Sequence, residues 1–173
     1  MIGLNIGSGQ RRFDPTHGWI NVDVISRPPD QVPDLICDVG KEPLPYADGT
    51  VDVVVLHHVY EHFHLAEGDG VIREAHRVLK PGGSLIVTVP DLKALAEAWL
   101  RGKISEYIYC VNLYGAYQGE PGDDHHWGYT LPSLASALVA AAQWSRVKPF
   151  DWREIPAASI CKDWWITGVE CIR

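Results

Sequence analysis

The sequence has 173 residues, which is enough for one domain with a sizeable core. Its 46% hydrophobic and 21% charged residues are typical of a soluble globular protein, and no apolar run reaches the length of a membrane span. The net charge of −7, without a long Lys/Arg run, disfavours DNA and large RNA as partners. No signal-peptide pattern opens the chain, and its four cysteines form no C-x-x-C pair. We therefore expect a single cytoplasmic domain with reduced cysteines and neither a nucleic-acid nor a membrane partner.

The first apolar run of the sequence ends in a glycine turn, Gly7-Ser8-Gly9, and the next apolar run ends at Asp23. Because glycine has no side chain, a ligand can approach the backbone N–H groups of such a turn. A carboxylate at the end of the neighbouring strand can accept both hydroxyls of a ribose. The pair predicts a nucleoside-cofactor site at the carboxyl edge of a parallel sheet. The alternative is that Asp23 only caps its strand.

Apolar runs and turn signals predict alternating strands and helices through about residue 100. The strongest strand is Val51–Leu56, which is β-branched and nearly continuous, as in a strand covered on both faces. A helix follows over about Glu67–Leu79, and Lys80-Pro81-Gly82-Gly83 ends it. A further helix begins after Asp91, the candidate N-cap. The other early strands are expected at Ile2–Ile6, Ile20–Val24, Leu35–Cys37 and Ser84–Val89.

The helix and strand pattern weakens after residue 102 and returns near the C-terminus. Residues 103–130 are rich in Tyr and Gly and predict no regular element. Leu131–Trp144 is a clear helix, with Thr130 as a candidate cap, and two last strands are expected at Val147–Phe150 and Trp164–Ile172. Strands that alternate with helices predict a parallel α/β sheet.

Motifs along the first half of the chain occur in the same order in a known family. They are Leu-Asn-Ile-Gly-Ser-Gly at 4–9, Gly-Trp-Ile-Asn-Val-Asp at 18–23, Cys37-Asp38, Leu-Pro-Tyr-Ala-Asp-Gly-Thr-Val-Asp at 44–52, Glu61-His62 and Arg-Val-Leu-Lys-Pro-Gly-Gly at 77–83. In order and spacing the chain resembles the class I S-adenosylmethionine-dependent methyltransferases, most closely their small type 11 group. The resemblance covers roughly residues 2–92.

The resemblance implies a fold and a cofactor. The fold would be a three-layer, Rossmann-like α/β domain whose seven-stranded, mostly parallel sheet ends in an antiparallel C-terminal hairpin. The cofactor would be S-adenosyl-L-methionine. The methionine part of the cofactor would lie against the glycine turn and a histidine at the end of the fourth strand. A carboxylate would bind the ribose, and a second carboxylate with the backbone of the next residue would bind the adenine. The implied residues are Asn5, Gly7, Ser8, Gly9 and His57 for methionine, Asp23 for ribose, and Asp38 and Val39 for adenine.

The histidines after the fourth strand support two different functions. His58 is the candidate general base, because imidazole titrates near neutrality and this strand end faces the cleft; a packing role is the alternative. His58-Val59-Tyr60-Glu61-His62 also matches the inverted zinc-peptidase motif, in which two histidines on one helix bind zinc. That zinc hydrolase is the alternative function. We expect no metal site, because a strong strand, not a long helix, precedes His58.

In many members of this family, a segment before the first strand covers the cofactor. Here the first crossover is short and no helix is expected before the first strand, so another part of the chain must cover the cofactor. We expect residues 103–130 to form that lid and part of the acceptor site, given their aromatic density. The expected acceptor is a small molecule or a saccharide-like metabolite. A catalytically silent, cofactor-binding module is a further alternative.

Overall fold

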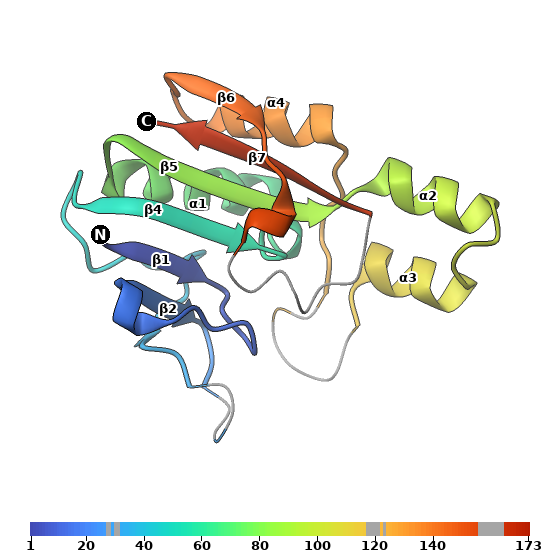
Figure 1. Cartoon of the computed structure of the whole chain (residues 1–173), viewed down its shortest axis with the longest axis horizontal. Helices are drawn as coiled ribbons and strands as arrows, with labels where there is room; N and C mark the ends of the chain where they lie inside the picture. The colour runs from blue at the N-terminus through green and yellow to red at the C-terminus, as the bar shows by residue number, and fades with distance from the viewer. Residues whose placement is uncertain (27–28, 30–31, 117–121, 123, 156–164) are drawn as a thin grey trace.

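The fold is built on one seven-stranded sheet with the strand order β3-β2-β1-β4-β5-β7-β6. The computed structural model describes residues 1–26, 29, 32–116, 122, 124–155 and 165–173 (Figure 1). The strands from β1 to β5 run parallel, and β7 runs antiparallel to both β5 and β6. The bounds are β1 Gly3–Ile6, β2 Trp19–Asp23, β3 Leu35–Ile36, β4 Val51–His57, β5 Leu79–Pro90, β6 Arg146–Pro149 and β7 Ile166–Ile172. The predicted sheet and its antiparallel C-terminal pair are confirmed.

Two helices, α1 (Leu65–Val78) and α4 (Leu131–Ala141), cover one face of the sheet and lie against each other. Helix α1 buries a stripe of small and branched residues at helical spacing, which is why this sequence forms an amphipathic helix on the sheet. Helix α4 begins with a capping box in which Thr130 and Ser133 bind each other's backbone N–H groups. The larger hydrophobic core lies between these helices and the strands, and it includes Leu4, Val54, Leu56, Ile72, Leu85 and Leu134.

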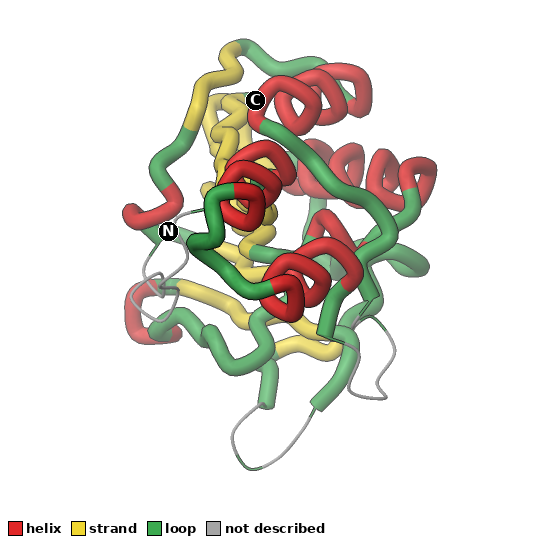
Figure 2. Tube along the Cα trace, turned by 90° about the vertical axis from the view of Figure 1, so that its right-hand side faces the viewer, coloured by secondary structure: helices red, strands yellow, loops and turns green. Residues whose placement is uncertain are grey.

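The opposite face of the sheet is covered by short 3-10 helices and loops. Helix η1 (Pro15–His17) lies between β1 and β2, and η3 (Trp152–Glu154) lies between β6 and β7. A smaller apolar cluster under them joins Phe13, Trp152 and Val55 of β4. In Figure 2 the strands form a band with the long helices mainly to one side of it. The short connection between β1 and β2 therefore contains only the 3-10 helix η1, in agreement with the very short helix that its length predicts.

Helices α2 (Leu92–Leu100) and α3 (Glu106–Tyr114) form a pair beyond the carboxyl end of β5 (Figure 1). Asp91 caps α2 as predicted, accepting hydrogen bonds from the backbone N–H groups of Lys93 and Ala94 at 2.9 and 3.1 Å. Helix α3 was not predicted by the sequence. None of its residues is fully buried, so its apolar residues do not fall on a single stripe that periodicity could detect.

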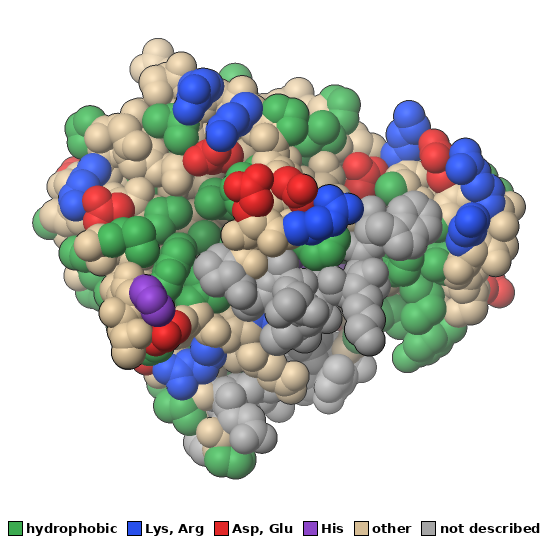
Figure 3. Space-filling view, in the orientation of Figure 1, with side chains coloured by type: hydrophobic (Ala, Val, Ile, Leu, Met, Phe, Trp, Pro, Cys, Tyr) green, Lys and Arg blue, Asp and Glu red, His purple; other side chains and the backbone are tan. Residues whose placement is uncertain are grey.

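Charges of both signs are mixed on the face drawn in Figure 3, where Lys and Arg side chains lie close to Asp and Glu side chains. Neighbouring strands β6 and β7 are also joined by an ion pair, in which the Lys148 ammonium lies 2.6 Å from a carboxylate oxygen of Glu170. Among the described residues, no helix is long and apolar enough to cross a membrane.

Candidate active site

The glycine turn follows β1 directly and is held against β2. The Ser8 N–H donates to the Val22 carbonyl oxygen at 3.1 Å, and Gly7 and Gly9 have φ angles of 64° and 44°. At Gly7 a Cβ atom would lie 2.3 Å from Cγ2 of Val59, so the turn packs directly against the segment that follows β4. At Gly9 a Cβ atom would meet nothing within 4 Å. The turn is thus closed on its inner side and open at Gly9.

Asp23 ends β2 beside this turn, as predicted. Its Oδ2 accepts a hydrogen bond from the Gly9 N–H at 2.8 Å, and its Oδ1 accepts from the Ile25 N–H at 3.3 Å. The carboxylate is therefore fixed in orientation by two backbone groups. Because each carboxylate has about four lone-pair positions, it can still accept hydrogen bonds from a ligand.

Asp38 follows β3, and its carboxylate is held by its own loop. Oδ1 accepts from the Gly40 N–H at 3.2 Å, and Oδ2 forms an ion pair with the Lys41 ammonium at 2.7 Å. Because Lys41 is exposed, this ion pair is a weak constraint on Asp38. Val39 is the next residue of the same turn.

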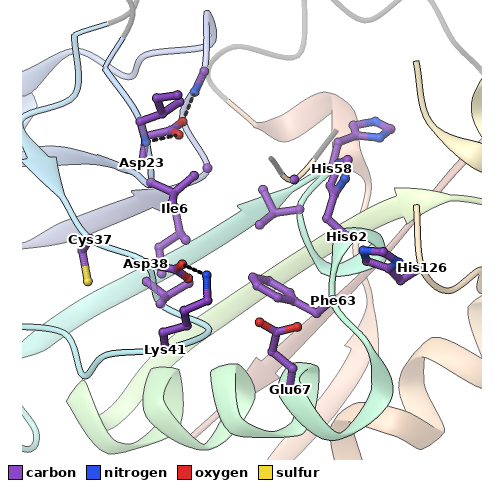
Figure 4. Close-up of a pocket in the computed structure, with 17 residues that line it drawn as sticks. Ile6, Asp23, Cys37, Asp38, Lys41, His58, His62, Phe63, Glu67 and His126 are labelled. Atoms are coloured by element: carbon purple, nitrogen blue, oxygen red, sulfur yellow. Dashed lines mark hydrogen bonds and ion pairs between the residues drawn. The ribbon is translucent and has the colours of Figure 1, made fainter. Parts of the chain in front are cut away.

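These groups border one cavity of about 480 Å³, which is within the size range of small-ligand and cofactor sites. Figure 4 shows Asp23 and Asp38 on one side of the cavity and His58, His62 and His126 on the other. Of the residues predicted from the sequence, six line it: Gly7, Gly9, Asp23, Asp38, Val39 and His58.

Three other predicted residues, Asn5, Ser8 and His57, are buried and do not line the cavity. Asn5 donates from Nδ2 to Asn21 Oδ1 at 2.9 Å and to the Arg11 carbonyl oxygen at 2.8 Å. These bonds join β1 to β2 and to the chain after the glycine turn. Asn5 and Ser8 therefore stabilise the glycine turn from its buried side, away from the cavity.

His57 ends β4 and is only 5% exposed. Its Nδ1 lies 2.5 Å from the Thr88 hydroxyl oxygen on β5. Burial, with the neighbouring His58 and Arg11 adding to it, lowers the pKa of His57 to about 3. The imidazole is thus neutral at physiological pH.

His58 has a left-handed backbone conformation, with a φ angle of 57°, and is one of the residues that line the cavity. Its Nδ1 lies 3.2 Å from Glu61 Oε1, and Glu61 is buried. Helix η2 (Tyr60–His62) is a single 3-10 turn. The long helix that would place His58 and His62 on one face, as in the inverted zinc-peptidase motif, is therefore not formed.

The cavity also has lining residues that the sequence did not indicate, including Lys41, Phe63 and Glu67, the last from the first turn of α1. The described part of 103–130 contributes Gly122 and His126. Its tyrosines lie elsewhere. Tyr107 and Tyr114 are 73% and 65% exposed, while Tyr129 is buried and stacks on Tyr60 with ring centroids 5.1 Å apart. Aromatic density alone did not identify which residues face the cavity.

The cavity fits a nucleoside cofactor in three respects. A glycine turn is open toward it at Gly9, two carboxylates at successive strand ends border it, and its apolar wall includes Ile6 and Phe63. The site also lies where the strand order reverses, between β1 and β4, outside the carboxyl ends of the strands. Ligands of open α/β sheets bind at such a switch point.

Comparison with known proteins points to one family. A family model described as a methyltransferase domain, of type 11, matches residues 14–87. No curated protein matches the chain in sequence.

Solved structures share the fold over the whole chain. An S-adenosylmethionine-dependent methyltransferase from Archaeoglobus fulgidus has a TM-score of 0.63 and 14% identity, over 99% of this chain and 85% of the other. The Burkholderia thailandensis 1,6-didemethyltoxoflavin-N1-methyltransferase, with bound 1,6-didemethyltoxoflavin and S-adenosylhomocysteine, has a TM-score of 0.54 and 15% identity, over 98% and 68%. Human N-acetylserotonin methyltransferase, in complex with S-adenosylmethionine, has a TM-score of 0.59 and 14% identity, over 99% and 47%.

Proposed function

We propose that this chain is a class I S-adenosylmethionine-dependent methyltransferase, that it binds its cofactor in the cavity beside the glycine turn, and that it methylates a small molecule. The observation that carries the proposal is the 2.8 Å hydrogen bond between Asp23 Oδ2 and the Gly9 N–H. This bond supports the proposal because it joins the carboxylate that we propose for ribose binding to the open part of the glycine turn.

In this proposal Asp23 accepts hydrogen bonds from the two ribose hydroxyls, and Asp38, with the Val39 backbone, binds the adenine. Gly7 and Gly9 border the methionine part. Asn5, Ser8 and His57 stay on the methionine side as positioning residues, which hold the turn and the end of β4 through the buried hydrogen bonds described above. The described contacts of these residues support the assignment because they fix the backbone that the cofactor would touch.

The cofactor supplies a methyl group already activated on a sulfonium centre, so the chain mainly aligns the acceptor and excludes water. His58 is the proposed general base for an acceptor that loses a proton. It lines the cavity opposite Asp23, and Glu61 at 3.2 Å orients its ring.

The proposed acceptor is a small molecule or a saccharide-like metabolite that enters beside His62, Phe63 and His126. Residues 103–130 are the proposed lid and contribute to this end of the cavity through Gly122 and His126. We place the enzyme in the cytoplasm, because the described cysteines Cys37, Cys110 and Cys171 are free thiols.

Calorimetry with S-adenosylhomocysteine tests the cofactor site. The wild-type protein should bind with micromolar affinity, and Asp23→Ala should weaken binding about 10- to 150-fold, the equivalent of the ~1.5–3 kcal/mol of a charge-assisted hydrogen bond. Asp48→Ala is the matched control, because Asp48 is exposed and pairs with Arg77 outside the cavity. Absence of binding by the folded wild type would refute the proposal, and unchanged affinity of Asp23→Ala would refute the ribose assignment.

A further inference from the structure

Three side chains of types that can bind a metal ion lie together beside the cavity, which His62 lines: Glu61, His62 and His125. One ligand atom from each lies within 4.8 Å of the other two. Glu61 and His62 belong to η2, whereas His125 belongs to the segment before α4. The Glu61 carbonyl oxygen joins these segments, since it accepts hydrogen bonds from the N–H groups of His126 and Trp127 at 2.8 and 3.1 Å. The cluster is therefore part of the folded framework.

Glu61 presents an unsatisfied carboxylate oxygen. The residue is 1% exposed, and its Oε1 lies 3.2 Å from His58 Nδ1. Its Oε2 is buried and has no hydrogen-bond partner in the part of the chain that the structure describes. A buried, charged oxygen without a partner is costly, so a ligand that binds Oε2 would stabilise the fold.

The two imidazoles are oriented as metal ligands usually are. Nδ1 of His62 lies 3.0 Å from the Asp124 carbonyl oxygen, and Nδ1 of His125 lies 2.9 Å from the Asn112 carbonyl oxygen. Because a carbonyl oxygen only accepts hydrogen bonds, each Nδ1 carries the proton and donates it. The lone pair of each neutral ring is then on Nε2. Backbone carbonyls commonly fix metal-binding histidines in this way.

We propose that Glu61, His62 and His125 bind one divalent transition-metal ion, preferably Zn²⁺, through the carboxylate and the two Nε2 atoms. Two imidazoles and one carboxylate are the protein donors of many catalytic zinc sites, which keep a position open for another ligand. This set differs from the inverted zinc-peptidase string, because His125, far along the chain, takes the place of His58. His58 instead orients Glu61.

The coordination position of the ion that no protein ligand fills would lie next to the cavity. His62 lines the cavity together with His58 and His126 (Figure 4). An oxygen of the acceptor could therefore bind the ion while it faces the cofactor. This use of the ion rests on the proposed methyl transfer, whereas binding of the ion does not.

Calorimetry with Zn²⁺ alone, on the metal-stripped 173-residue chain, tests the site. We expect one ion per chain, and a visible absorption spectrum of low-coordinate Co²⁺ when Co²⁺ replaces Zn²⁺. Glu61→Gln and His125→Ala should each weaken Zn²⁺ binding more than about 100-fold, because losing even an outer partner of a ligand costs about 10- to 100-fold. Glu97→Gln and His17→Ala are matched controls on exposed residues and should bind like the wild type.

S-adenosylhomocysteine binding by the same variants separates the two proposals. Unchanged affinity for this ligand in folded His125→Ala, with Zn²⁺ binding lost, would support a metal site distinct from the cofactor site. Zn²⁺ binding without S-adenosylhomocysteine binding would support the metal site and refute the proposed function. If Glu61→Gln fails to fold, Zn²⁺ binding by His125→Ala and the Co²⁺ spectrum of the wild type still test the metal site. No stoichiometric Zn²⁺ in the folded wild type, or equal binding by His125→Ala and His17→Ala, would overturn the metal site.

Discussion

Arg77 and Glu74, one turn apart on α1, form a two-pronged ion pair. Arg77 Nε donates to Glu74 Oε2 at 2.9 Å, and Nη2 donates to Oε1 at 2.7 Å. The same guanidinium also binds Asp48 Oδ1 at 2.6 Å and the carbonyl oxygens of Tyr46 and Leu44 at 2.8 and 3.2 Å. Arg77 therefore attaches the connector between β3 and β4, which has no helix of its own, to the helix layer.

Arg77→Ala should lower the free energy of unfolding by about 2–3 kcal/mol, because several hydrogen bonds to a charged group are lost and the Tyr46 carbonyl oxygen loses its guanidinium partner. Arg77→Lys should recover only part of this, since an ammonium group cannot reproduce the planar fork. Urea unfolding at pH 7 measures both effects. Arg73→Ala, an exposed arginine on the same helix, is the control and should change stability by less than about 0.5 kcal/mol. Equal effects of the two alanine variants would contradict this role of Arg77.

His57 should make the fold sensitive to mild acid. Its pKa is about 3 in the folded chain and 6.5 without the fold, so between these values the unfolded chain binds the extra proton. Stability must then fall as pH is lowered through this window, by up to about 1.4 kcal/mol per pH unit. Between pH 7.5 and 5.0, wild type should lose about 2 kcal/mol more than His57→Gln, measured by urea unfolding. His17→Gln, at an exposed site, should keep the wild-type pH dependence, and a His57→Gln variant that also keeps it would disprove the assignment.

Gly7→Ala should reduce both stability and cofactor binding. A non-glycine residue at a φ of 64° costs about 1–2 kcal/mol, and the new Cβ would also meet Val59 Cγ2 at 2.3 Å. Gly102→Ala is a matched control, because Gly102 has the same φ of 64° but open space around it. Thermal unfolding should show a clearly larger loss for Gly7→Ala, and only this variant should bind S-adenosylhomocysteine more weakly. Equal losses would show that the contact with Val59 is unimportant.

The local sequence was sufficient to predict most strands, the helix caps and the glycine turn. The β-branched run of β4, the caps Asp91 and Thr130, and the Gly-x-Gly turn each have a physical cause within a few residues. The early strands, which carry the residues proposed to bind the cofactor, were therefore predicted close to their observed positions. The start of β5 was not, because Lys80-Pro81-Gly82-Gly83 carries helix-end signals yet continues a strand that pairs with β4.

The sequence by itself determined the sheet, the glycine turn and the two carboxylates at strand ends, because parallel strands bring their carboxyl ends to one edge wherever they pair. Only the tertiary structure decided which side chains from distant parts of the chain meet beside the cavity. His125 reaches Glu61 and His62 across more than sixty residues of chain, through backbone hydrogen bonds that no local pattern encodes. Side chains brought together from distant loops depend on the packing of the whole chain, and neither periodicity nor motif spacing describes that packing.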